Sequence, residues 1–175
     1  MNLTLIGYRG TGKTTVARLV ALDVGWEWVD MDVEIELRAG KSIAAIFADE
    51  GEPAFRDLES RVLGELVARD RLVIASGGGV VLREENRQAM KHSGKVVWLK
   101  ASPETIVSRV AADHANVQRR PQLTTSGGLA EIVQLLERRT PLYHQCADLE
   151  VDTDGRQPDG IAMEISQALR QWNAE

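Results

Sequence analysis

Residues 7–14 read Gly7-Tyr8-Arg9-Gly10-Thr11-Gly12-Lys13-Thr14, and this stretch decides the fold. The order glycine, four residues, glycine, lysine and then threonine is the pattern of a phosphate-binding loop. An apolar run at residues 2–6 predicts a strand before it, and Val16, Leu19 and Val20 predict a helix after it. A tight turn with a chance lysine is the alternative, but strand, glycine loop and helix together favour a phosphate site.

The chemistry of such a loop is anion binding. Glycines permit the positive φ angles that turn successive backbone N–H groups toward one anion, and the helix N-terminus adds partial positive charge. Lys13 is expected to reach the β and γ phosphates, and Thr14 to offer its hydroxyl to Mg²⁺. The sequence therefore predicts a nucleoside triphosphate site formed by Gly10, Thr11, Gly12, Lys13, Thr14 and Thr15.

Composition limits the class of protein. A chain of 175 residues, 43% hydrophobic and 27% charged, fits one globular domain over 1–175 and excludes collagen-like and wholly disordered chains. We find neither a secretory signal nor an apolar stretch that could span a bilayer, and expect a cytoplasmic protein. The net charge of −5 argues against nucleic-acid and membrane partners. A single cysteine and three scattered histidines indicate neither a disulfide nor a structural metal.

Short apolar runs indicate the remaining strands. They lie at 27–30, 72–75, 96–99 and 149–151 and alternate with helical patterns. Parallel strands need crossover helices, which cover both faces of the sheet. The expected fold class is therefore α/β, three layers with a five-stranded parallel sheet.

The helical patterns are uneven in strength. Residues 33–40 are helical or mixed, Ser42 caps a short helix through Phe47, and Pro53 begins a long helix. A helix from 129 to 143 is bent or ended by Pro141, and an amphipathic helix closes the chain. The polar run between Asp113 and Gly128 is typical of a mobile flap.

Two carboxylates indicate the site of a second substrate. The chain has no Asn-Lys-x-Asp segment for reading guanine, so a GTPase is unsupported. Asp30 and Asp32 follow the second strand, and in extended backbone both would point into the cleft. There one carboxylate could hold a metal ion through water while the other accepts a hydroxyl proton. The alternative is the first turn of a helix, where Asp is also favoured.

Glycines and arginines extend this prediction. Gly77-Gly78-Gly79 directly follows the third strand, where missing side chains would let a small substrate approach the backbone; a flexible hinge is the alternative. Arg56, Arg120, Arg139 and Arg156 are candidate anion clamps, although each alone is more often a solvated surface residue.

Six elements in order resemble the shikimate kinase family over nearly the whole chain. They are residues 7–15, Asp30-Met31-Asp32, the segment 46–56 ending in Phe55-Arg56, Gly77-Gly78-Gly79, Arg120-Pro121, and residues 139–143. The resemblance implies a P-loop fold of the nucleoside-monophosphate-kinase type. It also implies a substrate-binding segment at about 31–61 and a mobile lid at about 112–125.

The resemblance further implies transfer of the γ-phosphate of ATP to the 3-hydroxyl of shikimate, in the route to chorismate and aromatic amino acids. Arg56 and Arg139 would clamp the shikimate carboxylate, with Gly78 and Gly79 close to the ring. Asp32 would bind the hydroxyl groups of shikimate and serve as the base.

The nucleotide side follows from the same resemblance. Lys13 and Arg120 of the lid would neutralise charge on the transferred group, as an arginine finger does elsewhere. Asp30 would hold Mg²⁺ through water, beside Thr14. Arg156 resembles a residue that lies near adenine.

Some alternatives stay open. The lid has Gln122 where the family more usually has an apolar residue, Arg119 could replace Arg120, and Arg138 could replace Arg139. A kinase of another small hydroxy acid such as gluconate, and a nucleotide-responsive binding module without turnover, remain rival functions. We expect a monomer that binds ATP and shikimate and closes its lid to exclude water.

Overall fold

A parallel five-stranded sheet forms the centre of the computed structural model, which describes residues 1–112 and 128–174. Its strand order is β2-β3-β1-β4-β5, and each neighbouring pair is parallel. The bounds are β1 Asn2–Ile6, β2 Glu27–Asp30, β3 Leu72–Ala75, β4 Gly94–Lys100 and β5 Leu149–Asp152. The predicted fold class is confirmed.

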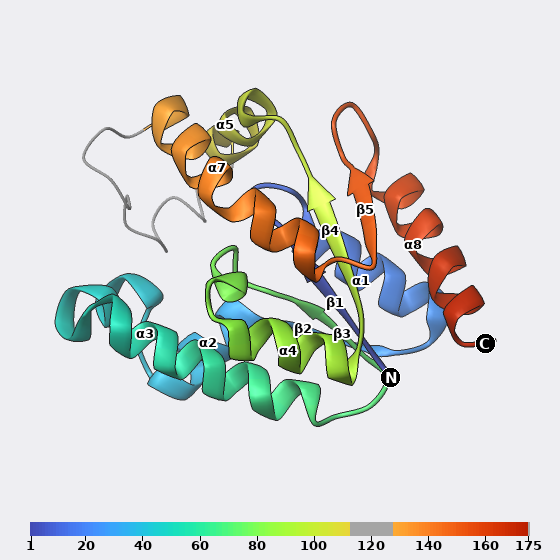
Figure 1. The fold of residues 1–175 in the computed structure, drawn as a ribbon, viewed down its shortest axis with the longest axis horizontal. Helices are drawn as coiled ribbons and strands as arrows, with labels where there is room; N and C mark the ends of the chain where they lie inside the picture. The colour runs from blue at the N-terminus through green and yellow to red at the C-terminus, as the bar shows by residue number, and fades with distance from the viewer. Residues whose placement is uncertain (113–127, 175) are drawn as a thin grey trace.

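Helices cover both faces of the sheet, which gives three layers (Figure 1). Helices α1 and α8 pack on one face, whereas α2, α3, α4 and α7 contribute to the core on the other. The bounds are α1 Lys13–Val24, α2 Met31–Ala39, α3 Ile43–Val67, α4 Glu84–Ser93, α5 Pro103–Ala112, α7 Gly128–Cys146 and α8 Pro158–Trp172, with the 3₁₀ helix η1 at Val80–Leu82. None of the helices in these ranges is long and apolar enough for a membrane span.

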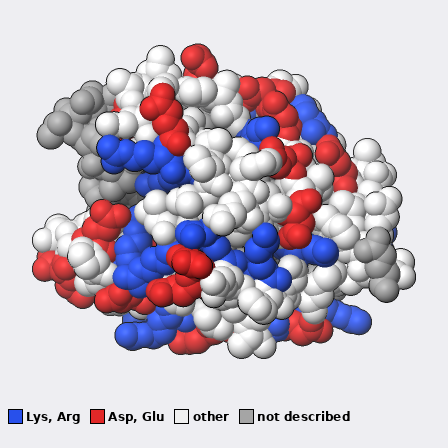
Figure 2. All heavy atoms as spheres, in the orientation of Figure 1, with Lys and Arg blue, Asp and Glu red and all other residues white. Residues whose placement is uncertain are grey.

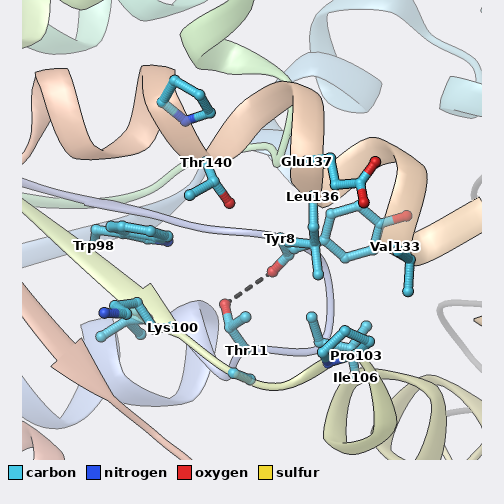
Figure 3. Close-up of a pocket in the computed structure, with 13 residues that line it drawn as sticks. Tyr8, Thr11, Trp98, Lys100, Pro103, Ile106, Val133, Leu136, Glu137 and Thr140 are labelled. Carbon is cyan, nitrogen blue, oxygen red and sulfur yellow. Dashed lines mark hydrogen bonds between the residues drawn. The ribbon is translucent and has the colours of Figure 1, made fainter.

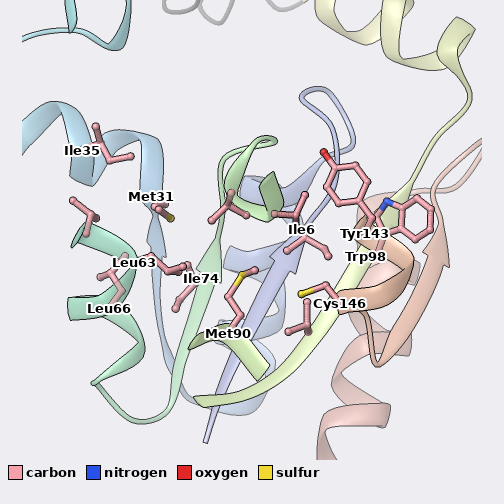
Figure 4. Close-up of a cluster of buried hydrophobic side chains, with 14 of the residues drawn as sticks. Ile6, Met31, Ile35, Leu63, Leu66, Ile74, Met90, Trp98, Tyr143 and Cys146 are labelled. Atoms are coloured by element: carbon pink, nitrogen blue, oxygen red, sulfur yellow. The ribbon is translucent and has the colours of Figure 1, made fainter. Parts of the chain in front are cut away.

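Each face of the sheet has its own hydrophobic core. Leu3 and Leu5 of β1 belong to the core beneath α1 and α8, whereas Ile6 belongs to the larger core, which Figure 4 shows. That larger core joins Ile74 of β3 to Tyr143 of α7. Every residue of β1 is buried, as expected for a central parallel strand that is covered on both faces.

The predicted elements mostly form, and the larger differences in extent concern β4, α7 and α3. Strand β4 is longer than 96–99, and α7 continues through Pro141 to Cys146. The two helices predicted around Ser42 and Pro53 run together as α3, with a kink at Gly51, whose φ of 81° and ψ of 173° are not helical. Ser42 caps this helix as predicted, accepting a hydrogen bond from the Ala45 backbone N–H.

The fold brings the candidate site segments together, because the carboxyl ends of parallel strands lie at the same edge of the sheet. The phosphate loop follows β1, Asp30 ends β2, and the glycine run follows β3. The predicted lid, 112–125, lies outside the described residues apart from Ala112, the last residue of α5.

Candidate functional site

The loop between β1 and α1 has the geometry of a phosphate cradle. Gly12 caps α1 with a φ of 91°, a conformation that a residue with a side chain rarely adopts. At Gly7 a Cβ would lie 2.4 Å from the Leu99 carbonyl oxygen, so no side chain fits. The Lys13 ammonium is buried and donates to the carbonyl oxygens of Gly7 and Tyr8, both at 2.8 Å. The lysine that would contact phosphate is therefore held within the loop.

Thr14 and Asp30, the two residues predicted to hold a metal ion, lie together. The Thr14 hydroxyl donates to Asp30 Oδ2 at 2.6 Å, across from the N-terminus of α1. The other oxygen of Asp30, Oδ1, accepts from the backbone N–H groups of Asp32 and Val33 and so caps α2. A hydroxyl and a carboxylate are oxygen ligands of the kind that Mg²⁺ prefers, so this pair fits the ion.

The prediction that Asp32 lies in extended backbone was wrong. The backbone becomes helical directly after Asp30. Asp32 therefore lies in the first turn of α2 and not in an extension of strand β2. The capping bonds from Asp30 and the acidic first turn stabilise this helix start, which is the alternative that the sequence left open. Asp32 is half-buried and still lies at the carboxyl end of β2.

Arg56 lies against the glycine run, as a site built from these segments requires. A Cβ placed on Gly79 would meet the Arg56 guanidinium at 2.5 to 2.8 Å. Two carboxylates hold that guanidinium: Glu59 at 2.7 Å, itself only 1% exposed, and the more exposed Glu52 at 3.0 Å. The absence of a side chain at Gly79 therefore makes room for Arg56, which is a packing reason that the sequence analysis did not find.

Arg139 reaches the same glycine run from α7. Its Nη1 donates to the Gly78 carbonyl oxygen at 3.2 Å, and the buried Tyr143 hydroxyl donates to the same oxygen. Arg139 is buried, whereas Arg138 is exposed, so the helix register selects Arg139 as the residue that faces the run.

Gly78 in turn packs on the phosphate loop. A Cβ at Gly78 would lie 3.4 Å from the Arg9 backbone nitrogen and from the Gly7 carbonyl oxygen. The loop, the glycine run, Arg56 and Arg139 therefore form one contiguous group, although they come from four separate parts of the chain.

Of the other two candidate arginines, the structure describes one. Arg120 lies outside the described residues. Arg156 donates to the Asp152 carbonyl oxygen and pairs with Glu164 of α8, so its side chain is held against the loop between β5 and α8.

The sequence did not indicate Arg109 of α5 as part of this region. Its guanidinium donates to the carbonyl oxygens of Gly10 and Thr153. A lone arginine on a helix gives no sequence signal for such a contact.

Basic groups give this region its electrostatic character. Figure 2 shows Lys and Arg side chains gathered on the left of that view, between the ends of α3 and α7, with Asp and Glu among them. Burial raises the pKa of the Tyr8 hydroxyl, and the neighbouring cations Arg9 and Arg139 oppose this effect. The overall charge of −5 thus coexists with a group of Lys and Arg side chains on this face, which suits anionic substrates.

A mostly apolar cavity of about 550 Å³ lies between β4, α5, α7 and the phosphate loop, which contributes Tyr8 and Thr11 to its wall (Figure 3). Its walls also include Trp98, Ile106 and Leu136. Thr11 points inward, where its hydroxyl donates to the Tyr8 carbonyl oxygen at 2.8 Å.

Comparisons with known proteins show the family of this chain. The family model described as shikimate kinase matches residues 9–170. The chain is 46% identical over 170 residues to a shikimate kinase of Pseudomonas putida, covering 97% of this chain and 96% of that one. It is also 46% identical over 167 residues to one of Rhodopirellula baltica, covering 95% and 89%. This chain belongs to the shikimate kinase family.

Solved structures support the same family and the fold. A shikimate kinase from Acinetobacter baumannii in complex with shikimate superposes with a TM-score of 0.90 at 37% identity, covering 97% of this chain and 93% of that one. A gluconokinase from Sinorhizobium meliloti reaches a TM-score of 0.63 at 17% identity, which shows a shared fold alone. The resemblance noted from the motifs is thus confirmed.

Proposed function

We propose that this member of the shikimate kinase family transfers the γ-phosphate of ATP to the 3-hydroxyl of shikimate, giving shikimate 3-phosphate and ADP. The observation that carries the proposal is the shared wall at Gly78. Its backbone packs on the phosphate loop, while its carbonyl oxygen anchors Arg139. A phosphate donor in the loop would therefore lie on one side of Gly78, and an acid whose carboxylate is held by Arg139 would lie close by on the other side.

The acceptor would be held by two guanidinium groups. Arg56 and Arg139 lie against adjacent glycines, so both can approach the same small anion. Guanidinium groups bind carboxylates through paired N–H donors in a fixed plane, which orients the acid as well as attracting it. The exposed Glu52 would give up its place beside Arg56 to the substrate, whereas the buried Glu59 would remain.

The donor would be held by the loop. Lys13 would leave the carbonyl oxygens of Gly7 and Tyr8 for the β and γ phosphates, with backbone N–H groups of residues 10–15 completing the cradle. Thr14 and Asp30 would hold Mg²⁺, Asp30 through water. When bound, that ion neutralises charge on the β and γ phosphates.

Asp32 would bind the acceptor hydroxyl groups and take the proton from the 3-hydroxyl as it attacks. Arg120 would bring positive charge to the transferred group when the lid closes and water is excluded. Arg156, in the β5–α8 loop, would lie toward adenine. We expect the enzyme to act as a cytoplasmic monomer.

The test is ADP release in a coupled assay with and without shikimate. Strong stimulation by shikimate, with gluconate inactive in a parallel reaction, is the expected result. ADP release that is insensitive to shikimate would refute the activity, and stimulation by gluconate alone would favour the rival hydroxy-acid kinase. The fold shared with the gluconokinase makes that comparison necessary. Binding of ATP without turnover of either acid would favour the binding module.

A further inference from the structure

Tyr8, the second residue of the phosphate loop, has a buried side chain that the proposed mechanism does not use. It is 2% exposed and packs in a small apolar cluster with Ile106 of α5 and with Ile132 and Leu135 of α7. Figure 3 shows the ring beneath α7, beside the apolar cavity. Packing from two helices holds the ring in one place, since a buried aromatic side chain has few alternative rotamers.

Two guanidinium groups lie near this ring. The central carbon of Arg139 is 5.7 Å from the ring centroid, and that of Arg9 is 5.9 Å. Both distances lie within the range in which a cation is attracted to an aromatic ring. Arg139 therefore has two anchors, the Tyr8 ring and the Gly78 carbonyl oxygen at 3.2 Å.

These two anchors fix the direction of Arg139. A guanidinium has five N–H donors in one plane, and contact with an aromatic ring consumes none of them. One donor bonds Gly78, so the ring can hold the group in place while other donors remain for a carboxylate. The backbone of Tyr8 meanwhile belongs to the phosphate cradle, because its carbonyl oxygen accepts from Lys13 Nζ and Thr11 Oγ1.

We propose that Tyr8 is a positioning residue for substrate recognition: its ring holds Arg139 in the orientation that binds the carboxylate of the acceptor. This inference rests on the proposed function. The chemistry that Tyr8 supports is recognition of a carboxylate on a small hydroxylated ring. The residue acts through Arg139 and touches no reacting atom.

The test compares Tyr8→Phe, which keeps the ring, with Tyr8→Leu and Tyr8→Met, which keep only apolar bulk. Shikimate affinity is measured by calorimetry and KM and kcat by the ADP assay. We expect Tyr8→Leu and Tyr8→Met to raise the Kd and KM for shikimate by about 5- to 30-fold, the equivalent of one desolvated cation–π contact. We expect kcat and the KM for ATP to change less than about 2-fold, and Tyr8→Phe to stay near the unaltered chain.

Two controls separate positioning from a structural effect. Ile106→Ala truncates the same apolar cluster from α5, and should lower the melting temperature without changing shikimate affinity. In an Arg139→Gln background, Tyr8→Leu should change the Kd for shikimate by less than about 2-fold, because the guanidinium through which Tyr8 acts is absent.

Each outcome decides the inference. Equal effects of Tyr8→Leu with and without Arg139 would overturn it, as would a loss of affinity in Tyr8→Phe equal to that in Tyr8→Leu. Should Tyr8→Leu not fold, Tyr8→Met and the Arg139→Gln background carry the same comparison. Failure of the unaltered chain to bind shikimate would overturn the proposed function as well. Normal binding that is unaffected by Tyr8→Met would overturn this inference alone.

Discussion

Gly79→Ala is the substitution that tests the geometry of the acceptor pocket most sharply. The added Cβ would lie 2.5 Å from Arg56 Nη1 and 2.6 Å from Nη2, well inside ordinary van der Waals contact. The guanidinium would have to withdraw on the order of 1 Å, yet it is held by Glu59 at 2.7 Å and Glu52 at 3.0 Å. We therefore expect Arg56 to be displaced from the substrate carboxylate while the chain stays folded.

The expected magnitude follows from the bond that would be lost. A hydrogen bond to a charged group contributes about 1.5–3 kcal/mol, which corresponds to about a 10- to 150-fold loss of affinity. Calorimetric titration with shikimate and the ADP assay should show this loss in the Kd and KM for shikimate. The KM for ATP should stay within about 2-fold, because the three nearest atoms to the Cβ added at Gly79 all belong to Arg56, whereas those at Gly78 belong to the phosphate loop.

Gly64→Ala is the matched control. It makes the same change in α3, the helix that carries Arg56, where a Cβ meets nothing within 4 Å. It should leave shikimate affinity unchanged and raise the free energy of unfolding by about 0.5–1 kcal/mol. Unchanged shikimate affinity in Gly79→Ala would refute the assignment, and so would an equal further loss when Gly79→Ala is added to Arg56→Ala, where no guanidinium remains to clash.

Three more predictions concern the metal pair, the buried ion pair and the thiol. Thr14→Val should lower kcat about 10-fold or more and raise the Mg²⁺ concentration for half-maximal rate, with Thr14→Ser close to normal; an unchanged Mg²⁺ titration would contradict the pairing with Asp30. Glu59→Ala leaves Arg56 with the exposed Glu52 as its one carboxylate partner among the described residues. Urea unfolding should therefore show a loss of about 3–5 kcal/mol, and a loss below about 1 kcal/mol would contradict a buried pair. Burial raises the pKa of Cys146 from 9.0 to about 11. As the pH rises, the thiol of the unfolded chain therefore ionises before that of the folded chain, so the free energy of unfolding should fall between pH 9 and 11, by about 2–3 kcal/mol relative to Cys146→Ala. Parallel pH profiles of the two proteins would contradict this.

The phosphate loop could be predicted from sequence because its information is local. The glycines, Lys13 and Thr14 lie within eight residues of one another, and the strand and helix on either side have clear periodicity. The same holds for the parallel sheet, whose short apolar strands alternate with helices.

The sequence placed Asp30 and Asp32 correctly at the carboxyl edge of the sheet, but it did not decide the backbone conformation that orients Asp32. Extension of β2 through Asp32 and a helix start at Asp30 were both compatible with the sequence. The helix start prevails because the Asp30 side chain satisfies two backbone N–H groups that would otherwise lack partners. Helix α4 was not predicted at all, although acidic Glu84 and Glu85 at its start and basic Lys91 near its end match the helix dipole.

The long-range contacts lay beyond sequence reasoning. The glycine run was interpreted as space for a ligand, whereas Gly79 also makes room for the side chain of Arg56 from another helix. Tyr8 gave no signal as part of a glycine motif, and its contact with Arg139 depends on how α7 packs over the loop. Only the packed chain brings together residues that are so far apart in sequence.

The central claim is that one cleft brings a nucleotide phosphate to the 3-hydroxyl of an acid held by Arg56 and Arg139. Phosphorus NMR of the enzyme with ATP, Mg²⁺ and shikimate tests it directly. The account predicts a new phosphomonoester signal coupled to the single proton on carbon 3, appearing in step with ADP. Formation of inorganic phosphate alone, or of an ester at another hydroxyl, would contradict the account.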